Sequence, residues 1–229
     1  MLFHSWVFLL FFLLFYSVFL LLRRTRFKDL WLLFCSYVFY AWWNPLYLAL
    51  IAWSTTVDYA MVGFMAESRR RGIWLSLSVV NNLALLGFFK YGGFVADNLN
   101  HLLSLAGISY ALPRPDVLLP VGISFYVFQS LSYTIDFYRG RVEKEKSFVR
   151  YATFVSLFPQ LVAGPVERAG NLLPQLRRRI AITWEDVSDG LSLFLVGFFK
   201  KVALADYLAL YVDRVYDVPE QFGGSALLF

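Results

Sequence analysis

The chain alternates between long apolar runs and short segments that carry most of its charge. The apolar runs cover Leu2–Leu22, about Leu30–Trp43, about Leu46–Ala66, about Ile73–Val95 and Leu119–Asp136. A helix needs about 20 consecutive apolar residues to cross a bilayer, and several runs approach that length. The pattern therefore predicts an all-α, polytopic integral membrane protein with about five to seven membrane helices, plus short re-entrant or interfacial helices.

The segment Tyr151–Val166 differs from the other apolar runs because it is short and interrupted. It contains Pro159 and Gly164-Pro165, and basic residues flank it at both ends. We expect a re-entrant or interfacial element here, since irregular backbone at membrane depth requires protein or water around it. The uncharged pair Asn44-Pro45 instead predicts a turn between two spans, because proline lacks a backbone donor and disfavours helix in the preceding residue.

A further helix start is predicted at Thr183-Trp184-Glu185-Asp186. This stretch has the pattern of a capping box, with Thr183 as the N-cap and acidic residues in the first turn. The helix that follows is apolar through Phe199 and then meets Lys200-Lys201. Two interpretations stay open: the helix dips partway into the membrane, or the lysines extend their charged ends to an interface.

Basic segments alternate with nearly neutral ones through Arg150. By the positive-inside rule the basic segments are cytoplasmic, which places the N-terminus outside. The net charge of +5 and the pI of 9.3 therefore indicate membrane topology and contact with lipid, and no nucleic acid partner is expected. The basic clusters contain Arg23, Arg24, Arg26 and Lys28; Arg69, Arg70 and Arg71; Arg139, Arg141, Lys144, Lys146 and Arg150; and Arg177, Arg178 and Arg179.

Composition supports the membrane interpretation. Of the 229 residues, 59% are hydrophobic, 20% are aromatic and 16% are charged, whereas ordinary globular chains carry about 25% charged residues. The mean hydropathy is +0.58. The only cysteine, Cys35, lies in an apolar run, which excludes an intrachain disulfide and a cysteine-based metal site.

Polar side chains within the apolar runs mark candidate functional positions. Gln129, Ser132 and Asp136 are three and four residues apart, so they share one face of the predicted helix. Asp58 and Asn81-Asn82 lie within other spans. Two interpretations stay equally open for these groups: interhelical hydrogen bonds, worth about 0.6 kcal/mol each, and a polar tunnel or substrate path.

The segment Phe158–Arg168 has two prolines around a short apolar core. Such a broken element presents backbone groups and the Gln160 side chain toward a buried cavity, or it is a structural re-entrant turn. Both interpretations stay open. The candidate substrate-binding residues are therefore Gln129, Ser132, Asp136 and Gln160.

No side chain in this sequence has the surroundings of a catalytic residue. His4 and His101 are the only histidines, and neither has a carboxylate or cysteine at metal-ligand or relay spacing. Ser124 lacks the second glycine of a nucleophile elbow, and no glycine-rich phosphate loop occurs. We therefore predict no catalytic residue, no metal site and no bound cofactor within the chain.

Several motif stretches follow one another along nearly the whole chain. They are Phe39–Tyr47, Phe88–Tyr91, Leu119–Gly140, Leu157–Val166 with Pro174-Gln175-Leu176, and Gly197–Val202 with Ala205-Asp206. In order and spacing they resemble the membrane-bound O-acyltransferase family, and most closely its bacterial alginate O-acetyltransferase branch.

The resemblance implies transfer of an acyl group to a hydroxyl. The implied donor is a cytoplasmic acyl thioester, acetyl-CoA or similar, and the implied final acceptor is an exported polysaccharide such as alginate. It also implies a multi-pass protein of the bacterial inner membrane that works with periplasmic polysaccharide-acetylation proteins.

One departure from the family matters for activity. The family's catalytic histidine lies in a C-terminal motif rich in Trp and Arg, and no stretch of this sequence corresponds to it. We therefore expect residues 1–229 to be the N-terminal part of a single membrane domain whose catalytic half is absent. We expect this chain alone to be inactive, since general base catalysis contributes about 10²–10⁴-fold.

Two other function classes remain as alternatives. The first is a non-catalytic membrane scaffold that recruits partners in an exopolysaccharide or cell-wall modification complex. The second is a small transporter, against which the lack of visible inverted repeats argues.

Overall fold

The computed structural model describes residues 3, 5–108, 110–115, 119–161, 164–165, 167–178, 181–222 and 224. Across these residues the regular elements are helices, without a β-strand, which confirms the predicted all-α class. They form two compact units, one from Leu14 to Arg179 and one that combines Leu2–Leu13 with Ile180–Phe229. The prediction of one membrane domain for residues 1–229 stays a prediction.

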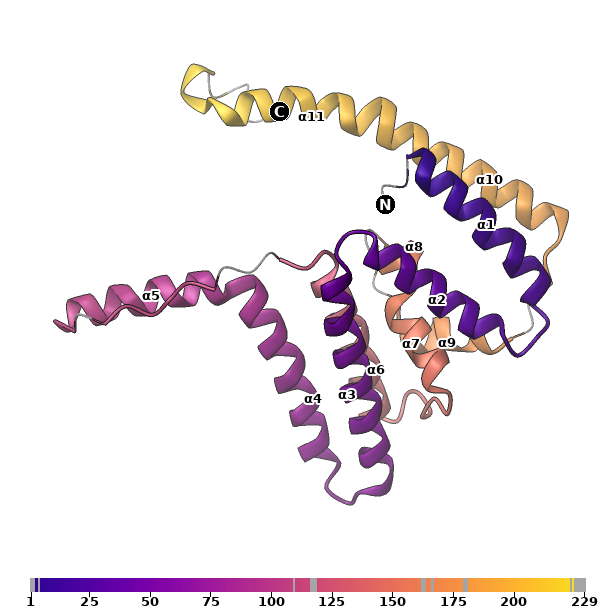
Figure 1. The fold of residues 1–229 in the computed structure, drawn as a ribbon, viewed down its shortest axis with the longest axis horizontal. Helices are drawn as coiled ribbons and strands as arrows, with labels where there is room; N and C mark the ends of the chain where they lie inside the picture. The colour runs from indigo at the N-terminus through magenta and orange to yellow at the C-terminus, as the bar shows by residue number, and fades with distance from the viewer. Residues whose placement is uncertain are drawn as a thin grey trace. The chain divides into compact units, whose positions relative to one another are not determined.

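The first unit contains most of the helices, and α1 contributes to both units (Figure 1). The elements up to the end of the first unit are α1 (Trp6–Leu22), α2 (Lys28–Ala41), η1 (Pro45–Tyr47), α3 (Leu48–Glu67), α4 (Arg71–Leu86), η2 (Gly87–Tyr91), α5 (Gly92–Leu105), α6 (Ile123–Tyr138), α7 (Phe148–Ser156), α8 (Phe158–Leu161) and α9 (Ala169–Arg177). The second unit continues with α10 (Trp184–Phe199), η3 (Lys200–Ala205), α11 (Asp206–Asp217) and η4 (Pro219–Gln221).

Two continuous helices of the described part are long and apolar enough to cross a membrane. They are Pro45–Glu67 and Arg71–Leu105, whereas the apolar helix Trp6–Leu22 is shorter. Large apolar side chains on these helices point outward, among them Leu10 at 68% and Phe94 at 69% exposure. Helices with apolar outer faces are typical of membrane spans. The predicted number of five to seven membrane helices stays a prediction.

The turn predicted at Asn44-Pro45 is confirmed. Helix α2 ends at Ala41, and the Asn44 side chain accepts a hydrogen bond from the Leu46 N–H at 2.9 Å at the start of η1. Pro45 takes the first helical position, where its missing N–H leaves no donor unpaired. Helices α3 and α4 then run side by side (Figure 1).

The fourth apolar run is longer and more irregular than predicted. The expected end was Val95, but helical structure continues to Leu105 through a π-helical turn, η2. Helix α5 leaves α4 at a pronounced bend at this turn (Figure 1). A π turn inserts an extra residue and breaks the regular hydrogen-bond pattern, which accounts for the bend.

Helix α6 begins four positions later than the start of the predicted tract at Leu119. Gly122 precedes it with φ +76°, a conformation that favours glycine. A Cβ atom at this position would also lie 2.7 Å from the carbonyl oxygen of Leu161. Glycine therefore allows α8 to approach the beginning of α6.

The predicted capping box of the second unit is confirmed. The Thr183 hydroxyl accepts from the Asp186 N–H at 3.2 Å, and the Asp186 carboxylate accepts from the Thr183 N–H at 2.8 Å. The helix does not stop at Lys200-Lys201, because the π-helical η3 carries it on into α11. Whether those residues dip into a membrane or lie at its surface stays open.

Candidate functional site

Two of the four candidate substrate-binding residues meet at a small pocket. Gln129 of α6 and Gln160 of α8 line it together with Phe125, Val155 and Leu161. The Gln160 Nε2 donates to the Gln129 Oε1 at 3.2 Å and to the Pro165 carbonyl at 3.0 Å. Gln129, which is 4% exposed, also donates to the Phe154 carbonyl at 3.4 Å. The pocket is apolar apart from this amide pair.

Gln160 reaches the pocket because the segment Tyr151–Val166 is interrupted, as predicted. Helix α7 ends at Ser156, and Leu157 turns the chain before α8 begins. The break was expected at Pro159, but Pro159 lies within α8, where the first turn tolerates proline. The Phe158 N–H donates to the Ser36 hydroxyl at 3.2 Å, so this helix start is tied to α2.

Aromatic packing and Gly164 also hold α8, and with it Gln160, in position. The Phe158 ring lies 5.0 Å from the Phe15 ring and 5.4 Å from the Phe39 ring, centroid to centroid. A Cβ at Gly164 would lie 2.6 Å from the Gln160 Cα, so a larger residue there would push the chain away. Val162, Ala163 and Val166 of the same motif lie outside the described residues.

Ser132 and Asp136 do not join the two glutamines at the pocket. Ser132 is half-buried, and Asp136 lies 3.6 Å from the Arg141 guanidinium near the end of α6. The three polar residues of α6 share a helix face, but the neighbouring helices differ along its length. The role of the four candidate residues Gln129, Ser132, Asp136 and Gln160 in substrate binding stays a prediction.

A second polar cluster surrounds Asp58, which is fully buried on α3. Its carboxylate accepts from the Ser78 hydroxyl at 2.6 Å and from the Asn82 amide at 2.9 and 2.8 Å, both on α4. The Ser130 hydroxyl of α6 also donates to this carboxylate. Interhelical hydrogen bonding, one of the two interpretations for Asp58 and Asn82, is therefore confirmed.

The cluster extends from Asp58 to two further helix positions. The Ser130 and Tyr151 hydroxyls are 2.8 Å apart. Since the single proton of Ser130 points to Asp58, Tyr151 is the donor between them. The Ser54 hydroxyl donates to the Asn82 carbonyl oxygen at 3.0 Å. A carboxylate and its neutral donors therefore join four helices, α3, α4, α6 and α7.

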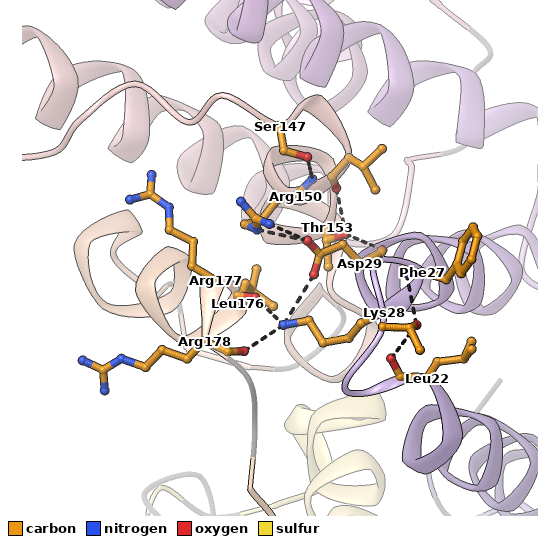
Figure 2. A network of polar contacts seen from close by, with 12 residues as sticks. Leu22, Phe27, Lys28, Asp29, Ser147, Arg150, Thr153, Leu176, Arg177 and Arg178 are labelled. Atoms are coloured by element: carbon orange, nitrogen blue, oxygen red, sulfur yellow. Dashed lines mark hydrogen bonds and ion pairs between the residues drawn. The ribbon is translucent and has the colours of Figure 1, made fainter.

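An ionic network connects α2, α7 and α9 at their ends (Figure 2). The Lys28 ammonium, 6% exposed, donates to the carbonyls of Leu176 and Arg178, the latter at 3.0 Å. Arg150 donates to Asp29 at 2.9 and 3.0 Å and to Glu145 at 3.1 Å. These contacts hold the polar ends of three helices together.

Glu145 is the buried centre of this network, with 1% exposure. Burial alone would raise the pKa of its carboxyl group. The Ser147 N–H and the guanidinium groups of Arg177 and Arg150 outweigh burial and hold the pKa below its ordinary value. The Arg177 Nε donates to Glu145 at 2.8 Å and the Ser147 N–H at 3.0 Å. Glu145 is therefore ionised at neutral pH.

The histidines do not form a site in the described part of the chain. His101 is exposed on α5, and His4 lies outside the described residues. No group of three His, Cys, Asp or Glu side chains that could hold a metal ion occurs within the described ranges.

The sequence is similar to proteins that are named O-acetylases or O-acetyltransferases. A protein named probable alginate O-acetylase AlgI from Azotobacter vinelandii is 40% identical over 234 residues, which cover 100% of this chain and 46% of that protein. The protein of the same name from Pseudomonas aeruginosa is 39% identical over 235 residues, 100% of this chain and 44% of that protein. These relatives confirm the resemblance to the membrane-bound O-acyltransferase family, to the N-terminal half of which the chain is similar.

A more distant relative is the peptidoglycan O-acetyltransferase of Helicobacter pylori, 32% identical over 224 residues, 85% of this chain and 42% of that protein. The chain spans about half the length of the curated relatives it matches, and it corresponds to their N-terminal half. No protein-family profile and no solved structure matches it.

Both amides of the pocket fall in stretches that carried the family resemblance, whereas several members of the hydrogen-bonded cluster around Asp58 were not found from sequence. Ser78, Ser130 and Tyr151 are ordinary residues of apolar helices, and nothing in their spacing distinguishes them from other serines and tyrosines. The basic cluster that ends at Arg150 was noted for topology, but its ion pairs with Asp29 and Glu145 were not predicted.

Proposed function

We propose that this chain is the N-terminal part of a membrane-bound enzyme that transfers acetyl groups to hydroxyls of an exported or cell-wall polysaccharide. The observation that carries the proposal is the 40% identity over its whole length to a protein named alginate O-acetylase. The relative named for peptidoglycan O-acetylation supports the broader class of polysaccharide acceptor. Alginate is the acceptor that the higher identity favours.

The location and the donor belong to the same proposal. A multi-pass arrangement in the bacterial inner membrane, with the N-terminus outside, fits the basic segments and the two long apolar helices. The donor is a cytoplasmic acyl thioester such as acetyl-CoA. Periplasmic polysaccharide-acetylation proteins are the partners that deliver the group to the polymer.

Within this enzyme we assign substrate contact to the amide pair of Gln129 and Gln160. Each amide has a donor and an acceptor end, and the pocket that they line is otherwise apolar. Few polar groups in an apolar pocket orient a bound molecule. The Gln160 Nε2 donates to the Gln129 Oε1, so a substrate hydroxyl, which both accepts and donates, can replace this bond without leaving either amide unpaired.

The test uses the natural protein in its own host, with variants introduced at the chromosomal locus. We expect Gln129→Ala and Gln160→Ala to lower the acetyl content of the polysaccharide, measured by proton NMR, at least about 10-fold at equal protein level. Gln175→Ala is the matched control, since it removes an exposed amide of α9. Normal acetylation in both pocket variants would show that the hydrogen bond between Gln129 and Gln160 serves the fold and not substrate binding.

The absence of a catalytic histidine within these 229 residues has a separate consequence. We expect the purified 229-residue chain to transfer no acetyl groups, because it lacks a positioned general base. Transfer by this chain alone, measured with radiolabelled acetyl-CoA and an oligosaccharide acceptor, would overturn that expectation. A chain of this length that accumulates in cells and co-purifies with other subunits would favour the scaffold function instead.

A further inference from the structure

The continuous helix Arg71–Leu105 is longer than one membrane crossing requires. It has 35 residues, which extend about 50 Å at about 1.5 Å per residue, whereas the hydrocarbon core of a bilayer is about 30 Å thick. Its first part, α4 with η2, contains 16 and 5 residues and is already long enough to cross. The 14 residues of α5 therefore need another location.

The turn η2 has the features of a membrane boundary. Helix α5 leaves α4 at a bend there (Figure 1). The turn carries Lys90 and Tyr91, both exposed, with the Lys90 ammonium 5.4 Å from the centre of the Tyr91 ring. In a single tilted span of 35 residues this lysine would lie deep in hydrocarbon, where a charge is costly. Lysine and tyrosine at the end of a crossing are typical of the interface between membrane and water.

Helix α5 has a polar face and an apolar face. Four polar residues recur at spacings of three and four, which places them on one side of the helix. They are Asp97, Asn100, His101 and Ser104. The large apolar residues on the remaining surface are exposed, and they are Phe94, Val95, Leu99, Leu102 and Leu105. An amphipathic helix of this kind is suited to lie in the plane of a membrane surface.

The connection that follows α5 packs on its polar face. Segment 110–115 runs back along the helix (Figure 1). The Asn100 side chain accepts from the Leu112 N–H at 2.7 Å and donates to the Leu112 carbonyl at 3.0 Å. The Arg114 guanidinium pairs with the Asp97 carboxylate. Because the connection occupies the polar side, the exposed apolar side chains do not serve to hold it.

Lipid is the occupant that fits the apolar face. The face continues from the crossing proposed for α4, which also exposes large apolar side chains such as Val80 and Leu83. Along α5, all of which the structure describes, the polar residue that interrupts this face is the uncharged Asn98, whose amide donates to the Phe94 carbonyl at 2.7 Å. A charged partner would find no complementary group on such a face.

We propose that α5 lies in the plane of the outer membrane surface, on the side opposite Arg69–Arg71, an inference that rests on the proposed membrane location. Its apolar face contacts the lipid headgroups and the upper part of the acyl chains. Segment 110–115 then lies on the water-facing side of the helix.

The experiment measures membrane depth at single positions of the natural protein. Its own cysteines, Cys35 among them, are replaced by alanine, and one introduced cysteine carries an environment-sensitive fluorophore. The labelled protein is reconstituted into vesicles of phosphatidylethanolamine and phosphatidylglycerol, with a nitroxide quencher near the headgroup or near the end of the acyl chain. Leu102→Cys and Leu105→Cys report on the apolar face, where the side chains are 60% and 72% exposed. Ser104→Cys is the matched control on the polar face.

We expect the probes at Leu102 and Leu105 to lose more fluorescence to the shallow quencher than to the deep one. An interfacial helix is buried only about 5–10 Å into the boundary between headgroups and acyl chains. The probe at Ser104 should instead be quenched by iodide in the water.

Three results would overturn the proposal. Equal lipid quenching at Leu102 and Ser104 would show that neither face prefers lipid. Stronger quenching at Leu102 by the deep label would indicate that α5 enters the hydrocarbon core. Protection of Leu102 from both lipid and iodide would show that another part of the protein covers the face.

Val80→Cys separates this inference from the membrane location on which it rests. Val80 lies near the middle of the crossing proposed for α4 and is 63% exposed, so its probe should be quenched most strongly by the deep label. Without such quenching, the crossing by α4 and the proposed membrane location would fail together. Deep quenching at Val80 without shallow quenching at Leu102 would overturn only the placement of α5.

Discussion

The Asp58 cluster and the Glu145 network both bury a carboxylate in the first unit, but they satisfy it by opposite means. Asp58 is surrounded by two hydroxyls and an amide, and no cation contacts it among the described residues. Glu145 is held by two guanidinium groups and a backbone N–H. One cluster relies on neutral donors and the other on charge.

The position along the helices explains the difference. Asp58 lies in the middle of α3, where the neighbouring helices offer only short polar side chains. Glu145 lies in the connection before α7, where the predicted cytoplasmic arginines are within reach. A long cationic side chain at membrane depth would require its own compensation, whereas a serine or asparagine requires little. The comparison indicates that the position of a buried carboxylate, within a helix or in a connection between helices, determines which donors it finds.

The largest effect is expected from Asp58→Ala. The change leaves the donors of Ser78, Asn82 and Ser130 without their acceptor, and each unsatisfied donor costs about 1–3 kcal/mol. The hydroxyls of Ser78 and Ser130 can rotate and donate to backbone carbonyls of their own helices, which offsets part of this cost. We therefore expect the free energy of unfolding to fall by about 3–5 kcal/mol. Thermal unfolding of the natural protein in detergent measures it.

Thr56→Ala on the same helix is the control for this change. Its hydroxyl is exposed and donates to the Ala52 carbonyl of α3 itself, so its removal should stay within about 0.5 kcal/mol. If Asp58→Ala were as mild as Thr56→Ala, the cluster would contribute nothing to the packing of α3 against α4 and α6.

A smaller loss is expected from Glu145→Gln. The variant removes both ion pairs, but Arg150 and Arg177 are 25% and 40% exposed and gain hydration in return. We therefore expect about 2 kcal/mol, below the 3–5 kcal/mol typical of fully buried pairs. The same unfolding measurement tests it. Arg141→Ala, which breaks a long pair of 3.6 Å between the exposed Arg141 and Asp136, should change stability by less than about 0.5 kcal/mol.

The response to acid sharpens the comparison. The pKa of Glu145 lies below its ordinary value, so its contribution to stability is complete above that ordinary value and is lost as the pH falls through the folded-state pKa. As the pH falls below the ordinary pKa of a glutamate carboxyl group, the wild-type protein should therefore lose more stability than Glu145→Gln, which has no carboxylate to protonate at this position. Equal losses would mean that the ion pairs do not stabilise the fold.

Some of these features were predictable because they are local. The Thr183 capping box and the Asn44-Pro45 turn depend on residues within four positions of one another, and both occur as expected. The helix class followed from apolar runs. The break between α7 and α8 falls at Leu157, two residues before the proline that predicted it. By contrast, the bend at η2 depends on an extra residue in a regular apolar pattern and was not predicted.

The contacts that form the sites could be predicted only in part. Polarity in an apolar run identified Asp58, Asn82, Gln129 and Gln160. Spacing on one helix then grouped Gln129 with Asp136, whereas the structure pairs Gln129 with Gln160 from another helix. A periodic pattern identifies residues on one face, but it does not say which part of that face each neighbouring helix covers.

The smallest effect is expected from Lys28→Met. The Lys28 ammonium donates to carbonyls at the end of α9, where the helix dipole favours a positive charge. Methionine keeps an apolar side chain of similar length and removes the charge, so the free energy of unfolding should fall by about 1 kcal/mol. Lys28→Arg is the control, because it restores a cation there and should recover part of that loss. Hydrogen exchange of the Leu173–Arg177 amides should rise in Lys28→Met. An unchanged exchange rate would mean that solvent already satisfies these carbonyls and that the network depends on Arg150 and Glu145 alone.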